Sequence, residues 1–78
     1  MIRTSRLSAV QKDILMLLVK RGHALSSNDV RMELRKRFIG IMTTNALRDL
    51  GYIRWTDQGW LATEQGRLRV QEENTRVV

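Results

Sequence analysis

The spacing of the apolar residues changes once along this chain, at Gly51, and that change most strongly restricts how the chain can fold. Before Gly51, apolar residues recur every three or four positions, which is the period of helices with one buried face. After it, Tyr52–Thr56 and Trp60–Thr63 alternate with a period of two, which indicates two strands. The predicted fold class is therefore mostly α with a small β-hairpin.

The first helix is predicted over residues 9–21. Ser8, with Gln11 three residues later, forms the pattern of a capping box, in which each side chain bonds the other residue's backbone amide. Gly22 is a typical left-handed residue after the last turn of a helix. The predicted buried stripe of this helix is Val10, Ile14, Leu17 and Leu18.

A second helix is predicted after Ser26 or Ser27, either of which can cap it, with Asp29 in its first turn. Residues 24–26 before it are compatible with a short strand. The buried line of the second helix is expected to be Val30, Leu34 and Phe38, at positions four apart.

A third helix is predicted over residues 39–50 and ends at Gly51; a shorter helix capped by Thr43 is the alternative. On a helical wheel, its predicted buried residues are Ile39, Met42, Ala46 and Leu50, within an arc of about 80°. The residues on the opposite arc are Ile41, Thr44, Asn45 and Arg48.

Residues 57–59 fit a three-residue hairpin loop that ends in a left-handed glycine. This loop length pairs Thr56 with Trp60 and Trp55 with Leu61. The residues predicted to face the core are Ile53, Trp55 and Leu61. The residues predicted to face outward are Tyr52, Arg54, Thr56, Trp60 and Ala62.

A last helix is predicted over about residues 64–73, capped by Thr63, with Leu68 and Val70 as its apolar contacts. The length of 78 residues allows one domain. We expect a single domain over residues 1–78, with a core of about 8–73 and flexible ends.

The chain has a formal net charge of +6, and the excess of positive charge lies in its first two-thirds. Residues 1–22 carry five lysines and arginines against one acidic residue, and residues 23–51 carry five against three. Residues 52–78 carry four of each sign. This asymmetry favours an anionic partner, and nucleic acid is the first candidate.

The chain has no cysteine and one histidine, His23, which excludes disulfides, thiol catalysis and zinc sites of the usual kind. No catalytic residue, metal or cofactor is expected, so we do not predict an enzyme. The longest apolar run is Ile14–Val19, far shorter than the ~20 residues of a membrane span. No secretion leader is recognisable. A cytoplasmic, nucleoid-associated protein without membrane contact is the expectation.

The predicted order of helix, short strand, helix, turn, helix, hairpin and helix resembles the winged helix-turn-helix domains of small prokaryotic or phage-type regulators. Residues 47–53, Leu-Arg-Asp-Leu-Gly-Tyr-Ile, look like the end of a recognition helix that enters the wing. Residues 61–67, Leu-Ala-Thr-Glu-Gln-Gly-Arg, look like the exit from that wing. The chain departs from the pattern at residues 38–40, which lack the usual small residue followed by glycine, and at 57–59, where the wing tip is acidic.

The resemblance implies a sequence-specific protein that binds double-stranded DNA, a transcriptional regulator, with the third helix in the major groove. In that helix, Ile41 suits a thymine methyl group, Asn45 suits adenine, Arg48 suits guanine, and Thr44 suits either kind of contact. The expected phosphate contacts are Arg31, Arg35, Lys36, Arg37 and Arg54. Arg3 and Arg6 are candidates for an N-terminal arm along the DNA backbone. For the residues of the third helix and for Arg3 and Arg6, a solvated surface is the alternative. For residues 35–37, Arg-Lys-Arg, the alternative is that they only complement the dipole of the second helix.

One small domain covers a short DNA site, so a homodimer on a two-fold site is expected. Its contact would be the last helix, through Leu68, or the outer hairpin face, through Tyr52 and Trp60. The alternative function is a winged-helix module or small inhibitor that binds a protein through that face without reading bases. The last helix could instead cover Trp60. RNA binding is less favoured, because few aromatic residues are available to stack on bases.

Overall fold

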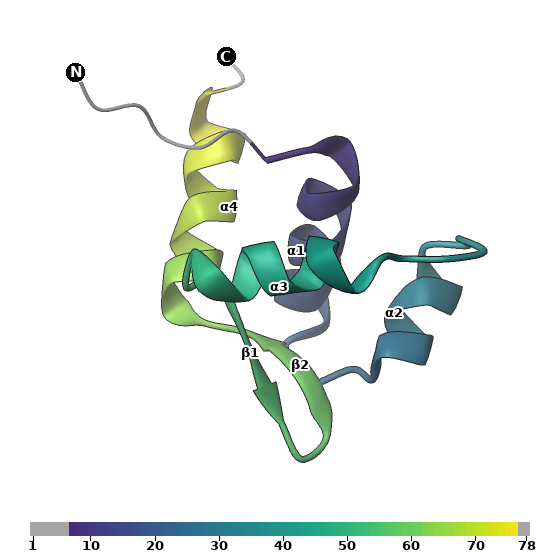
Figure 1. Ribbon diagram of the computed structural model, residues 1–78. Coiled ribbons are helices and arrows are strands. Elements are labelled where there is room, and N and C mark those ends of the chain that lie inside the picture. Colours follow the sequence, from purple (N-terminus) through teal and green to yellow (C-terminus); the bar gives the residue numbers. More distant parts are fainter. Residues whose placement is uncertain (1–6, 77–78) are drawn as a thin grey trace.

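Three of the four helices begin at capping residues that the sequence supplies, and the hairpin follows the third helix. The computed structural model describes the backbone of residues 7–76 and the side chains of residues 7–72. Within that part of the chain the elements are α1 (Ala9–Arg21), α2 (Ser27–Glu33), α3 (Ile41–Asp49), β1 (Ile53–Thr56), β2 (Gly59–Ala62) and α4 (Glu64–Arg76). In Figure 1, α3 crosses in front of α1, with α4 to one side, α2 to the other and the hairpin below. The expected class, helices with a small hairpin, is confirmed.

Helix α1 has the predicted bounds. Ser8 and Gln11 form both hydrogen bonds of the capping box, at 2.9 and 3.2 Å, and Gly22 ends the helix with a φ of 73°. The predicted stripe was incomplete: Ile14 and Leu18 are buried, Val10 and Leu17 are half-buried against the core, and Leu15, which was not predicted, is buried as well. Leu15 is buried because α4 packs against its side of α1.

Helix α2 begins as predicted but ends earlier. The Ser26 hydroxyl caps it by accepting from the Asp29 amide at 3.0 Å, and Val30 is buried. After Leu34 the chain reverses through Arg35, whose φ of 56° is left-handed, so the buried line does not continue. Phe38 therefore lies in a loop with its side chain 78 % exposed, and its assignment to the core was wrong.

Helix α3 begins at Ile41, after the extended residue Gly40. Both predicted starts, Ile39 and a Thr43 cap, were wrong. Its buried side chains are those of Thr44 and Leu47.

The buried face of α3 differs from the predicted one. Met42 is 80 % exposed, Leu50 is also exposed, and Ala46 is half-buried. Thr44 is buried in their place. Its hydroxyl donates a hydrogen bond to the Ile41 carbonyl at 3.0 Å, so the only donor of the side chain is satisfied away from water.

The hairpin register is shifted by one residue from the predicted one. Thr56 pairs with Gly59, so the loop is residues 57–58 rather than 57–59, and Trp55 pairs with Trp60. The shift turns every side chain of β2 to the opposite face. Trp60 and Ala62 are therefore buried with Ile53. Ile53 is buried and Arg54 is exposed as predicted, whereas the predicted faces were wrong for Trp55, Trp60 and Ala62.

Gly59 fixes this register because β2 also pairs with Leu25 on its other edge. Leu25 and Trp60 exchange two backbone hydrogen bonds, at 2.9 and 2.7 Å. A Cβ at Gly59 would lie 2.3 Å from the Leu25 carbonyl oxygen, so only glycine allows this approach. The short strand expected over residues 24–26 is thus a single bridge at Leu25.

Helix α4 is longer than the predicted 64–73. The Thr63 hydroxyl caps it as expected, accepting from the Gly66 amide at 3.1 Å, and also donates to the Gly51 carbonyl. Val70 is half-buried and Leu68 is exposed. The predicted arm at Arg3 and Arg6, like the last two residues, lies outside the described residues.

The described core lies between α1, α3 and the hairpin. Its largest fully buried side chains are Ile14, Leu15, Leu18, Val30, Leu47 and Ile53. None of the helices over residues 7–76 is both long and apolar enough to span a membrane.

The close contact between α4 and the start of the hairpin predicts that Gly66→Ala destabilises the fold, although alanine is normally about 1 kcal/mol better than glycine inside a helix. A Cβ at Gly66 would lie 2.2 Å from the Tyr52 carbonyl oxygen and 3.0 Å from Leu15 Cδ1. Such overpacking costs about 1–3 kcal/mol, so urea denaturation should show a lower free energy of unfolding.

Gly22→Ala is the matched control. Its Cβ would meet nothing within 4 Å, so only the penalty of left-handed alanine, about 1–2 kcal/mol, is expected. A Gly66→Ala protein more stable than the parent would contradict the described packing of α4.

Candidate nucleic-acid interface

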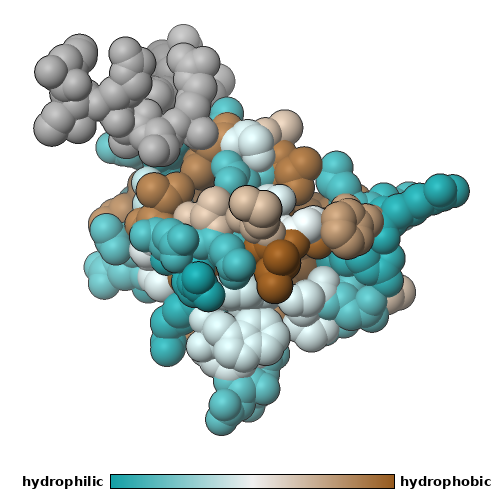
Figure 2. Space-filling model, in the orientation of Figure 1, coloured by the Kyte–Doolittle hydropathy of each residue, from teal (hydrophilic) through white to brown (hydrophobic). Residues whose placement is uncertain are grey.

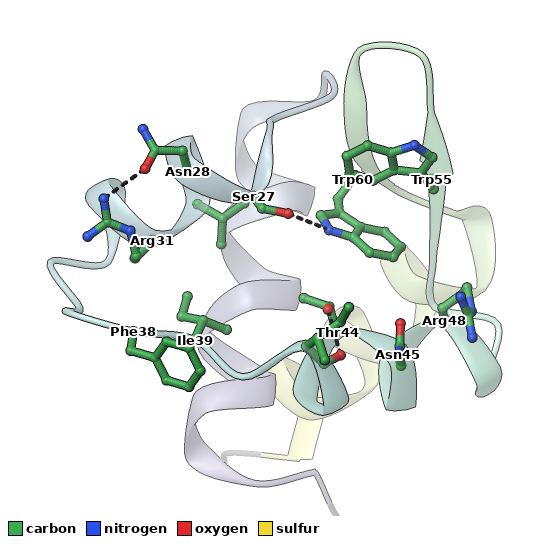
Figure 3. Close-up of a pocket in the computed structure, with 12 residues that line it drawn as sticks. Ser27, Asn28, Arg31, Phe38, Ile39, Thr44, Asn45, Arg48, Trp55 and Trp60 are labelled. Carbon is green, nitrogen blue, oxygen red and sulfur yellow. Dashed lines mark hydrogen bonds between the residues drawn. The ribbon is translucent and has the colours of Figure 1, made fainter.

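A groove of about 700 Å³ opens between α2, α3 and the hairpin (Figure 3). Its aromatic lining is Phe38, Trp55 and Trp60, and its charged lining is Arg31 and Arg48. Among the described residues no acidic side chain lines it. The groove therefore combines apolar walls with positive charge.

Helix α3 presents one side to this groove. Ile41, Asn45 and Arg48 follow one another at positions i, i+4 and i+7, so they share a face of the helix. Ile41 is 72 % exposed, Arg48 is exposed and Asn45 is half-buried. In Figure 3, Asn45 and Arg48 extend from α3 toward the side on which the Trp60 ring lies. Three of the four predicted base contacts thus lie together.

Thr44 lines the same groove but is buried (Figure 3). Its side chain is turned inward and is only 7 % exposed, with the hydroxyl bonded to the Ile41 carbonyl of its own helix. Thr44 therefore offers little surface for the predicted base contact. The physical reason is the phase of α3, which turns Thr44 and Leu47 to the core.

Arg48 pairs with the neighbouring Asp49. The distance from Nη2 of Arg48 to Oδ1 of Asp49 is 3.3 Å, and both side chains are at least half exposed. Exposed ion pairs of this kind contribute about 0–1 kcal/mol, so the pair does not prevent the guanidinium from turning to another acceptor.

The two tryptophans have exchanged their predicted environments. Trp60 is only 6 % exposed, and its indole Nε1 donates to the Ser27 hydroxyl at 3.2 Å. Trp55 is 56 % exposed, and its ring meets that of Trp60 edge to face, with centroids 5.0 Å apart. The shifted register turns Trp60 inward, where it contacts Leu25 and Ser27.

The outer hairpin surface that was predicted as an interface is therefore not present. Trp60 is buried, and Tyr52 is half-buried, with its hydroxyl accepting from Arg69 at 3.0 Å. The Arg69 guanidinium also lies 5.6 Å from the centre of the Tyr52 ring. Leu68 of α4 is exposed.

The five predicted phosphate contacts differ in accessibility. Arg31 is half-buried and donates to Asn28 Oδ1 at 2.7 Å and to the Lys36 carbonyl at 3.2 Å, so it holds the loop after α2. Lys36 is half-buried as well. The exposed cations of the set are Arg35, Arg37 and Arg54.

Four exposed apolar side chains were missed as surface residues: Phe38, Met42, Leu50 and Trp55. Phe38 and Met42 flank Ile41 in the sequence, and both had been assigned to buried faces. Figure 2 shows brown and tan atoms gathered over α3 and the loop before it, bordered by teal atoms. Gly40, between Phe38 and α3, was the available signal that the helix starts later.

Comparisons of the chain with family models, with curated proteins and with solved structures find no match. No cluster of three or more potential metal ligands from His, Cys, Asp and Glu occurs among the described residues. The function is therefore inferred from the geometry of the groove and of α3.

The burial of the tryptophans predicts opposite outcomes for two matched substitutions. Trp60→Ala removes a buried ring and its hydrogen bond to Ser27, so we expect a loss of about 3–5 kcal/mol in the free energy of unfolding. Trp55→Ala removes a ring that is mostly in solvent, and the loss should stay below about 1.5 kcal/mol, the edge-to-face contact included. Chemical denaturation followed by circular dichroism measures both, and equal losses would contradict the register.

Proposed function

We propose that this chain is a winged-helix protein that binds double-stranded DNA sequence-specifically, as a transcriptional regulator does, with α3 in the major groove. The observation that carries the proposal is the common face of Ile41, Asn45 and Arg48, which opens on a groove whose described lining includes no acidic side chain. The major groove admits a helix, and its edges offer partners for all three side chain types.

The chemistry of this face suits base recognition. The Arg48 guanidinium can donate two hydrogen bonds to O6 and N7 of guanine, and the Asn45 amide can pair with N6 and N7 of adenine. From residue 41 to residue 48 a helix rises about 10 Å, or roughly three base-pair steps of 3.4 Å. The face is therefore long enough to address about three base pairs.

Exposed cations lie on either side of α3 in the sequence. Arg35 and Arg37 precede it in the loop after α2, and Arg54 follows it on β1. Such residues suit phosphate contacts, which orient a protein on the duplex and provide most of the salt-dependent affinity. The net charge of +6 acts in the same direction.

The radius of gyration is 12.1 Å, so one copy covers a short stretch of duplex. We propose that two copies act together on a two-fold site, because a short site offers little selectivity. Leu68, exposed on α4, is the candidate contact between the copies.

A protein-binding module is the second candidate, and the exposed rings favour it. Phe38 and Trp55 both line the groove and are mostly in solvent, and aromatic residues are enriched where proteins bind each other. One titration distinguishes the two candidate functions. Absence of binding to any duplex at ~50 mM salt, where phosphate contacts are strong, would exclude the DNA proposal and leave the protein partner.

Arg48→Ala should weaken binding to the preferred duplex by about 1–3 kcal/mol and relax selectivity at one base pair. Fluorescence anisotropy with a duplex selected from a random pool measures both effects. Lys20→Ala on α1 is the control, because it removes one positive charge from a helix that does not line the groove. Equal effects of the two substitutions would show that Arg48 acts only through its charge.

Arg35→Ala should weaken binding to all duplexes alike, because an exposed loop arginine suits a phosphate better than a base edge. A plot of log affinity against log salt should lose about one unit of slope relative to the parent protein. An unchanged slope would remove Arg35 from the interface. Arg31→Ala is not a clean comparison, since Arg31 also holds the Lys36 carbonyl.

A further inference from the structure

Two exposed apolar side chains line the groove at the start of α3. Phe38 and Ile41 are 78 % and 72 % exposed, and we call them the α3 apolar cluster. Phe38 and Ile41 line the groove at the end of the helix face opposite to Arg48. One face of α3 thus has an apolar end and a cationic end.

A partner for this face needs an apolar group and polar groups in a fixed order. Arg48 and Asn45 would lose hydrogen bonds to water if a purely apolar surface covered them, which makes such a partner unfavourable. The edges of DNA bases meet both demands, since the 5-methyl of thymine is the apolar group of the major groove and polar atoms surround it.

We propose, on the basis of the proposed DNA-binding function, that the α3 apolar cluster contacts the 5-methyl group of a thymine in the major groove. The rise of about 10 Å between residues 41 and 48 places that thymine roughly three base pairs from the base pair that Arg48 contacts. 5-Methylcytosine carries the same methyl group at the same position of the ring, so it is the other source of this chemistry.

The test replaces each thymine of the selected duplex in turn by deoxyuridine, which differs only by the methyl group. At one thymine the affinity should fall about fourfold, which corresponds to the ~0.8 kcal/mol of one buried methylene-sized group. In a second series a cytosine takes the place of that thymine, with and without a 5-methyl group. The methylated form should bind more tightly than the unmethylated one.

Two matched variants assign the effect to the cluster. Ile41→Ala should bind thymine and deoxyuridine duplexes equally, whereas Met16→Ala, which shortens an exposed apolar side chain on α1 outside the groove, should keep the fourfold preference. Circular dichroism confirms that both variants fold, as expected for exposed positions.

The outcomes distinguish a failure of this inference alone from a failure of the proposed function. Equal affinity for thymine and deoxyuridine at every position would overturn the methyl contact, while the duplex binding itself would uphold the proposed function. A selected site without thymine, or an Ile41→Ala protein that still prefers thymine, would overturn it as well. Failure to bind any duplex would overturn both proposals.

Discussion

The two backbone hydrogen bonds between Leu25 and Trp60 are the contact on which the rest of this structure depends. They join the segment before α2 to the hairpin, so two elements far apart in the sequence form the two walls of one groove. The Trp60 indole stabilises this contact further by donating a hydrogen bond to the Ser27 hydroxyl. Gly59 makes the approach sterically feasible, and the position of α2 relative to the hairpin follows from it.

The parts of the fold that could be predicted from the sequence depend on short-range interactions. The capping residues Ser8, Ser26 and Thr63 each bond an amide three residues later, so the starts of α1, α2 and α4 are encoded within a single turn. The end of α1 also depends on a short-range feature, the left-handed conformation of Gly22 directly after the helix. At the candidate site, Asn45 and Arg48 were correctly placed on an accessible side of α3.

The parts that failed depend on contacts between distant segments or, at Thr44, on a hydrogen bond that a helical wheel does not count. The register of the hairpin depends on the pairing of β2 with the distant Leu25 backbone, which Gly59 permits, and a shift of one residue turned Trp60 inward. Thr44 was misplaced because a wheel counts it as polar, whereas its hydroxyl bonds within its own helix.

The arrangement of the two strands has a consequence for self-association. Leu25 pairs with one residue on the outer edge of β2, whereas within residues 7–76 no strand pairs with the outer edge of β1. Unpaired edges invite strand addition and aggregation. Here the edge is four residues long and carries a cation at Arg54, features that natural proteins use to discourage such growth. The hairpin can therefore keep Trp55 in solvent with a reduced tendency to polymerise.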